Sequence, residues 1–127
     1  MTITEVSEKF GLSQDTLRYY EKIGLLPNVN RDNRGRRCYT QEDCNWVEFI
    51  KCMRSAGLPI EALIEYVDLF KQGDETMNAR KEILIQQRKE LIKKMEEINK
   101  TVERLDFKIK KYEDTDIING EKILHKY

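Results

Sequence analysis

The residues best suited to chemistry in this sequence are arginines and tyrosines that gather in two stretches. Arg18, Tyr19, Tyr20 and Lys22 lie close together, and the stretch PNVNRDNRGRRCY (27–39) holds four arginines against one aspartate. A guanidinium makes paired, charge-assisted hydrogen bonds to phosphate, and a tyrosine adds a hydroxyl donor on a stiff side chain. Because the 23 basic and 23 acidic residues of the whole chain cancel, this local clustering is what indicates a nucleic-acid partner.

The three cysteines are the second group with possible chemistry. Cys38, Cys44 and Cys52 form no closely spaced pair, and the one histidine, His125, lies near the end of the chain. Metal sites and disulfide frameworks use denser or even sets, so we expect reduced thiols, no metal and no cofactor. The sequence also lacks a Ser, His and Asp set and a glycine-rich phosphate loop, which argues against an enzyme.

Cys52 has the surroundings of a reactive thiol. On a helical wheel centred on Trp46, Cys52 falls at the edge of the apolar arc, and Cys44 falls on the opposite side. We therefore expect Cys52 to be partly buried, with Lys51 and Arg54 next to it in sequence. Because a nearby cation lowers the pKa of a thiol, Cys52 is the candidate effector-sensing residue, although a small apolar packing role is the common alternative.

Two short helices are predicted to carry the first basic stretch. Thr2 and Glu5 have capping-box spacing, and Gly11 ends that helix. Ser13 suits the N-cap of a second helix that closes near Gly24. Two helices joined by a tight turn form a helix-turn-helix, whose second helix typically lies in the major groove of DNA.

The rest of the first 73 residues is predicted as a wing and two more helices. Residues 27–39 lose helical periodicity and read as a hairpin-like loop. A third helix runs from Thr40 or Gln41 to Gly57, and a fourth has Pro59 at its first position and ends at Gly73. Their expected buried stripes are Trp46, Phe49, Ile50, Met53 and Ala56, and Ile60, Leu63, Ile64, Val67 and Phe70.

One long helix follows, because no glycine or proline occurs from Glu75 through Ile118. A helix from about Met77 to Tyr112 would be on the order of 50 Å long. Apolar residues recur along it at the alternating spacing of a coiled coil, which predicts self-association through either parallel or antiparallel pairing. This seam consists of Leu84, Leu91, Met95, Ile98, Val102, Leu105, Ile109 and Tyr112.

The predicted fold is all-α with a small β wing. Residues 1–73 form a winged helix-turn-helix DNA-binding domain with an accessory helix pair, and residues 74–127 form a coiled-coil dimerisation helix with a short tail. We expect the tail from Asp114 to be short helix or to dock weakly on a partner subunit. The sequence has neither a signal-peptide pattern at its start nor an apolar run of roughly 20 residues, so we expect a cytoplasmic protein.

The run TLRYYEKIGLL (16–26), followed by the wing ending in RCYT (37–40), resembles the MerR family of transcription regulators. The resemblance implies a homodimer, joined by an antiparallel coiled coil, on a pseudo-palindromic promoter. It also implies that the dimer bends and untwists DNA between promoter elements that are spaced too far apart, and so acts on RNA polymerase indirectly.

The resemblance also implies roles for particular residues. Cys52 lies where a subgroup responding to aldehydes or other thiol-reactive electrophiles carries a cysteine. The main alternative function is a coiled-coil interaction protein whose helical head binds another protein. The residues expected to contact DNA, mostly at phosphates, are Arg18, Tyr19, Tyr20, Lys22, Arg34, Arg36, Arg37 and Tyr39.

Overall fold

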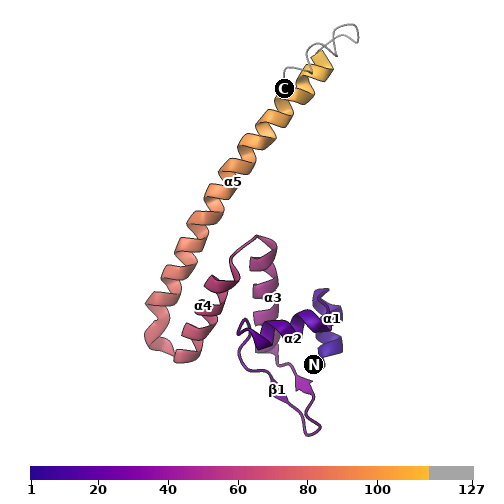
Figure 1. Ribbon diagram of the computed structural model, residues 1–127, viewed down its shortest axis with the longest axis vertical. Helices are drawn as coiled ribbons and strands as arrows, with labels where there is room; N and C mark the ends of the chain where they lie inside the picture. Colours follow the sequence, from indigo (N-terminus) through magenta and orange to yellow (C-terminus); the bar gives the residue numbers. More distant parts are fainter. Residues whose placement is uncertain (115–127) are drawn as a thin grey trace. The chain divides into compact units, whose positions relative to one another are not determined.

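The computed structural model describes residues 1–114, which fall into a first compact unit, Met1–Gln87, and a second that begins at Arg88. In this described part, helices account for most of the chain, and a two-stranded antiparallel hairpin interrupts them (Figure 1). The predicted all-α class with a small β wing is confirmed. The expected structure of the tail lies outside the described residues.

The helix-turn-helix is formed by α1 (Ile3–Phe10) and α2 (Gln14–Lys22). The Thr2 hydroxyl accepts the Glu5 N–H at 3.1 Å and the Glu5 carboxylate accepts the Thr2 N–H at 3.1 Å, as the capping-box spacing predicts. Gly11 ends α1 with φ +64°, a left-handed conformation that glycine adopts without steric cost. The Ser13 hydroxyl accepts the Thr16 N–H at 3.0 Å and starts α2.

The wing is a hairpin of β1 (Asn30–Arg31) and β2 (Arg37–Cys38), in which Asn30 pairs with Cys38 and Arg31 with Arg37. Its turn is closed by backbone hydrogen bonds from Asp32 N to Arg36 O at 2.8 Å and from Gly35 N to Asp32 O at 3.0 Å. The strands are short, so the turn and its side chains determine the shape of the wing.

The core of the first unit corrects the expected inner face of α3 (Gln41–Ser55). Cys44, Val47 and Ile50 are the buried apolar residues of this helix, whereas Trp46 is only half-buried. The helix carries two apolar stripes, and the stripe of smaller residues packs inward. The buried apolar residues of the unit are Val6, Leu17, Leu25, Leu26, Val29, Tyr39, Cys44, Val47, Ile50, Leu58, Leu63 and Val67.

Helix α4 (Ile60–Gln72) buries Leu63 and Val67. Pro59 is the N-cap of this helix and not its first helical residue, because its backbone is extended (ψ 140°). The helix therefore begins one residue later than predicted. The short 3-10 helix η1 (Asp74–Thr76) follows. The buried Thr76 hydroxyl donates toward the carbonyls of Leu69 and Gly73 at 2.6 and 2.7 Å, which satisfies the end of α4.

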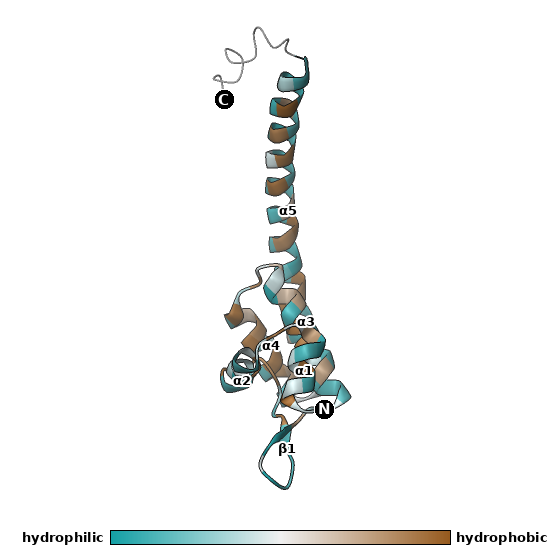
Figure 2. Ribbon diagram, turned by 90° about the vertical axis from the view of Figure 1, so that its right-hand side faces the viewer, coloured by the Kyte–Doolittle hydropathy of each residue, from teal (hydrophilic) through white to brown (hydrophobic). Residues whose placement is uncertain are grey.

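The long helix α5 (Met77–Asp114) has 38 residues and a length of about 57 Å at the usual rise. The predicted span of Met77 to Tyr112 is confirmed and continues for two more residues. Apolar residues recur along this helix between hydrophilic ones (Figure 2). Through residue 114, no helix is both long enough and apolar enough to cross a membrane.

Candidate nucleic-acid interface

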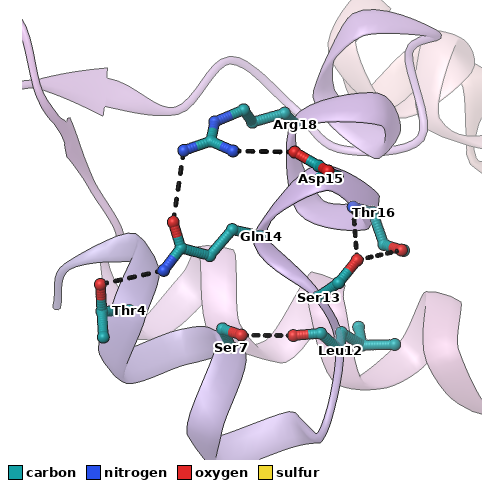
Figure 3. A network of polar contacts seen from close by, with 8 residues as sticks. All are labelled: Thr4, Ser7, Leu12, Ser13, Gln14, Asp15, Thr16 and Arg18. Atoms are coloured by element: carbon teal, nitrogen blue, oxygen red, sulfur yellow. Dashed lines mark hydrogen bonds and ion pairs between the residues drawn. The ribbon is translucent and has the colours of Figure 1, made fainter.

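The outer face of α2 presents Arg18 within a network of polar side chains (Figure 3). Arg18 Nη1 donates to Asp15 Oδ1 at 3.1 Å, and Arg18 Nη2 donates to Gln14 Oε1 at 3.3 Å. The Gln14 amide in turn donates to Thr4 Oγ1 on α1 at 3.1 Å. The Arg18 side chain is 45% exposed, so this predicted DNA contact is accessible and oriented by its neighbours.

The two adjacent tyrosines of α2 have different environments. Tyr19 is 49% exposed and Tyr20 is half-buried, so Tyr19 is the outer of the two. Lys22 is exposed in the last turn of the same helix. Arg18, Tyr19 and Lys22 are therefore all accessible to a ligand that lies along α2.

A single carboxylate organises the wing. Asp32 Oδ1 accepts the backbone N–H groups of Arg34 and Arg36, both at 2.9 Å, and Asp32 Oδ2 accepts Nε of Arg36 at 3.1 Å. The hydrogen bond from the Arg36 backbone, with a smaller one from Arg34, holds the pKa of the Asp32 carboxyl below its ordinary value. Arg34 and Arg36 remain exposed, at positions set by the turn.

Arg37 faces inward from the wing toward α2. Its Nε donates to Glu21 Oε1 at 2.7 Å, and both side chains are largely covered, 20% exposed for Arg37 and 17% for Glu21. Glu21 Oε2 also accepts the Val29 N–H at 3.2 Å, at the start of the wing. This pair joins the wing to the end of α2, so Arg37 is placed to hold the wing as well as to meet a ligand.

Tyr39 is buried, with 2% of its surface exposed, in contrast to the other predicted contact residues. Within residues 1–114 its hydroxyl has no hydrogen-bond partner, and burial raises the pKa of the phenol. The backbone of Tyr39 pairs with that of Met1 through N–H to carbonyl bonds of 2.8 and 2.7 Å. A direct contact between Tyr39 and DNA stays a prediction, and its position is that of a core residue beneath the wing.

The cysteines correct the predicted burial on α3. Cys52 is exposed rather than partly buried, and Cys44 is buried at 1% exposure rather than on the solvent side. The cations beside Cys52 have other partners: the Lys51 ammonium donates to the carbonyl of Phe10, and Arg54 Nη1 donates to the Leu58 carbonyl at 2.5 Å. The Cys52 thiol is thus accessible, but its sequence neighbours are committed elsewhere.

A second surface of the first unit is aromatic. Trp46 makes an edge contact with Phe70 at 4.9 Å between ring centroids and with Phe49 at 6.1 Å, and Tyr66 lies 6.0 Å from Trp46. Glu42 and Asn45 complete an open groove beside Trp46, Phe49 and Tyr66. The sequence predicted Trp46, Phe49 and Phe70 as core, whereas together with Tyr66 they form a half-buried cluster along α3 and α4.

The predicted seam of α5 is largely exposed in the single chain. Leu84 is 37% exposed and Ile98 is 62% exposed, while Leu91 is half-buried. Met95, Val102, Leu105, Ile109 and Tyr112 lie between 46% and 58%. Removing a row of apolar side chains from water is favourable, so a continuous exposed row of this kind indicates a surface that another one covers.

Sequence reasoning did not single out the acceptors that orient these arginines. Asp15 and Asp32 lie three and four residues before the arginines they bind, a spacing that the sequence shows. Glu21 and Arg37 are 16 residues apart, so only the fold brings that pair together. No group of three or more His, Cys, Asp or Glu side chains that could hold a metal occurs within residues 1–114.

Comparison with known proteins places this fold. The family model described as "MerR HTH family regulatory protein" matches residues 1–69, and the model described as "MerR, DNA binding" matches residues 45–106. The HTH-type transcriptional regulator AdhR of Bacillus subtilis is 58% identical over 92 residues, which are 72% of this chain and 66% of that protein. This chain therefore aligns with slightly less than two thirds of that relative's length.

Two solved structures are similar over most of the chain. A MerR family transcriptional regulator from Listeria monocytogenes has a TM-score of 0.88 at 45% identity, covering 99% of this chain and 95% of that one. HiNmlR, a MerR family regulator lacking the sensor domain and solved bound to promoter DNA, has a TM-score of 0.81 at 31% identity, covering 88% and 89%. These matches favour a regulator over a coiled-coil interaction module. The matched families and relatives are transcription regulators rather than enzymes, and the chain belongs to the MerR family.

Proposed function

We propose that this chain binds double-stranded promoter DNA as a homodimer, with α2 in the major groove and the wing against the sugar-phosphate backbone. The observation that carries the proposal is the charge of the segment 18–39, which holds six basic and two acidic residues in a chain of net charge zero. HiNmlR, which has the same fold, was solved bound to promoter DNA, and this supports the assignment.

Within this interface the accessible cations are the best phosphate ligands. Arg34 and Lys22 are exposed, and neither side chain has an ionic partner within the described residues. Arg36 and Arg37 would keep the wing in shape through Asp32 and Glu21 while they approach the backbone. Tyr19 adds an exposed hydroxyl, and the half-buried Tyr20 and buried Tyr39 support the surface from beneath.

The proposal is tested by titrating the full chain against a fluorescent duplex taken from upstream of its own gene, at several salt concentrations. We expect selective binding whose logarithm falls linearly with the logarithm of salt concentration, because phosphate contacts release counterions. Arg34→Ala and Lys22→Ala should each flatten that slope by about one. Lys93→Ala, on α5, is the matched control and should leave it unchanged; no salt-dependent binding to any duplex would contradict the proposal.

The exposed seam supports the proposed dimerisation through α5. Covering apolar side chains contributes about 25 cal/mol per Å², so a row of them along several turns favours a second copy strongly. Leu105→Glu places a charge in the middle of the seam, and we expect it to shift the protein to monomer by light scattering. Glu103→Ala, two positions away, is the control that should stay dimeric.

The antiparallel direction that the family resemblance implies is part of the proposal and has its own test. The middle of the segment from Leu91 to Tyr112 lies near residue 102, so two Tyr112 positions in an antiparallel pair would be about 30 Å apart. Tyr112→Cys should then form no additional disulfide-linked dimer on oxidation, compared with the unmodified chain. Rapid cross-linking through the new cysteine would indicate parallel pairing.

We further propose that the dimer distorts promoter DNA between polymerase recognition elements and that modification of Cys52 switches it. The exposure of the Cys52 thiol supports access by an electrophile. Cys52→Ser should abolish the transcriptional response to an aldehyde while DNA affinity is kept. Cys38→Ser, which also removes an exposed thiol, is the control, and an unchanged response in the Cys52 variant would overturn the switch.

The proposed distortion of the promoter has a separate test. A duplex labelled at both ends reports bending by energy transfer between the two labels.

A further inference from the structure

The hydrogen bonds on the first turns of α2 hold the Arg18 side chain in one position, whereas a solvated surface arginine is free to move. Two of the five N–H donors of the guanidinium are used, one on each terminal nitrogen, by Asp15 Oδ1 and Gln14 Oε1. Three donors remain, enough for a bidentate contact on the outer edge. The group is held from two sides, so it loses little rotamer freedom when a ligand binds.

Gln14 acts as a positioning residue because both ends of its amide are occupied. Its oxygen accepts from Arg18 at 3.3 Å, and its nitrogen donates to Thr4 Oγ1 at 3.1 Å, which ties the arrangement to α1 (Figure 3). The amide oxygen has a second lone pair and the amide nitrogen a second N–H. The two contacts nevertheless fix the orientation of the amide, so it holds the Arg18 guanidinium from one side.

The position of Asp15 favours a contact between Arg18 and a base over one with a phosphate. Its side chain is 95% exposed, and its second oxygen, Oδ2, has no partner within residues 1–114. A phosphate that approached Arg18 would be repelled by this carboxylate. A G·C pair in the major groove instead presents the guanine O6 and N7 acceptors beside the cytosine N4 donor, which matches a guanidinium beside a carboxylate.

We infer that Arg18 and Asp15 read one G·C base pair in each half of the DNA site, and that Gln14 positions Arg18 for this contact. Arg18 donates to O6 and N7 of guanine, and Asp15 Oδ2 accepts from N4 of the paired cytosine. The inference rests on the proposed function, and it assigns a base to a residue that family resemblance assigns mostly to phosphate.

The experiment selects bound duplexes from a pool of randomised sequence with the full-length dimer and sequences them. We expect a G·C pair to be preferred about 10-fold at one position of each half-site. Arg18→Lys loses the bidentate geometry and Asp15→Asn loses the acceptor charge, so both should reduce this preference to about twofold or less. Gln14→Ala should lower it in the same direction, and Glu48→Gln, an exposed carboxylate of α3, should leave it intact.

The outcomes separate this inference from the proposed function. If the unmodified chain enriches no sequence and binds no duplex, the proposed function fails. If it enriches a sequence but Asp15→Asn tightens binding to all duplexes with an unchanged base preference, Asp15 is only a repelling surface charge and the inference is overturned. It is equally overturned if Arg18→Ala flattens the salt slope by about one while the base preference stays the same, since Arg18 then contacts phosphate.

Discussion

The ion pair between Glu21 and Arg37 should stabilise the folded first unit, and a double-mutant cycle measures by how much. A hydrogen bond to a charged group contributes about 1.5–3 kcal/mol when it is covered. Both side chains keep about a fifth of their surface in water, 17% and 20%, so solvent screening reduces this. We expect Glu21→Ala and Arg37→Ala to couple by about 1–2 kcal/mol in urea unfolding at fixed protein concentration.

The exposed pair of Asp15 and Arg18 is the control for this cycle. Their side chains are 95% and 45% exposed, and a helix-surface pair of this spacing contributes about 0.2–0.5 kcal/mol. A coupling between Glu21 and Arg37 no larger than that of the control would refute the conclusion that the pair holds the wing. The denaturant slope should be the same in all variants, because a changed slope would mean that the cycle compares different unfolding transitions.

One variant of this cycle, Glu21→Ala, should change DNA binding in the opposite direction from that expected from net charge alone. Glu21→Ala makes the interface more positive, which by itself would raise affinity for any duplex. Because Glu21 orients Arg37 and the Val29 N–H, we expect its loss to weaken binding instead. A tighter complex would show that the charge of Glu21 matters more than its contacts.

Two further predictions concern the turns. The pKa of Asp32 is lowered in the folded chain, so its contribution to wing order is present above its unfolded pKa and lost as pH falls through the folded value. The protection of the Arg34 and Arg36 amides, measured relative to the intrinsic exchange rate at each pH, should therefore fall at acid pH. Asp32→Ala, which lacks both acceptor oxygens, should show low protection throughout. Gly11→Ala should destabilise the protein by about 1 kcal/mol in thermal unfolding, because φ is +64° at this position. The cost comes from the backbone and not from crowding, since the nearest atom to the added methyl carbon would be Lys51 Nζ at 3.7 Å. Unchanged stability would mean that the turn relaxes.

Local features of the fold could be predicted from the sequence because their causes are local. Thr2 with Glu5, and Ser13 before α2, are caps whose hydroxyls accept from N–H donors three residues further on, and the structure confirms each. The length of α5 follows from a long stretch without glycine or proline. Such features depend on neighbours in sequence, which a single chain displays in full.

The inner face of α3 could not be predicted in the same way. Helical periodicity identifies apolar residues but does not decide which of two stripes packs inward, and the structure buries the stripe with Cys44 and Val47 rather than the predicted aromatic stripe with Trp46. The choice depends on the shape of the opposing surface, to which α1, distant in sequence, contributes. The predicted environment of Cys52 was wrong for the same reason.

The candidate site was predictable in its location but only partly in its arrangement. The clustering of arginines indicated the surface, and the spacing of Asp15 and Asp32 before their partners is visible in the sequence. The burial of Tyr39 and the pairing of Arg37 with Glu21 depend on where the wing returns to the first unit. No local pattern encodes that path.

The aromatic cluster of α3 and α4 gives this protein an intrinsic optical reporter. Trp46 is the one tryptophan of the sequence, so its fluorescence is free of overlap from other indoles. Its ring contacts Phe70, and the guanidinium of Arg80, on the first turns of α5, lies 5.5 Å from the centroid of the same phenyl ring. A shift at the start of the long helix would therefore alter the surroundings of the indole, and its emission can follow such a shift in unlabelled protein.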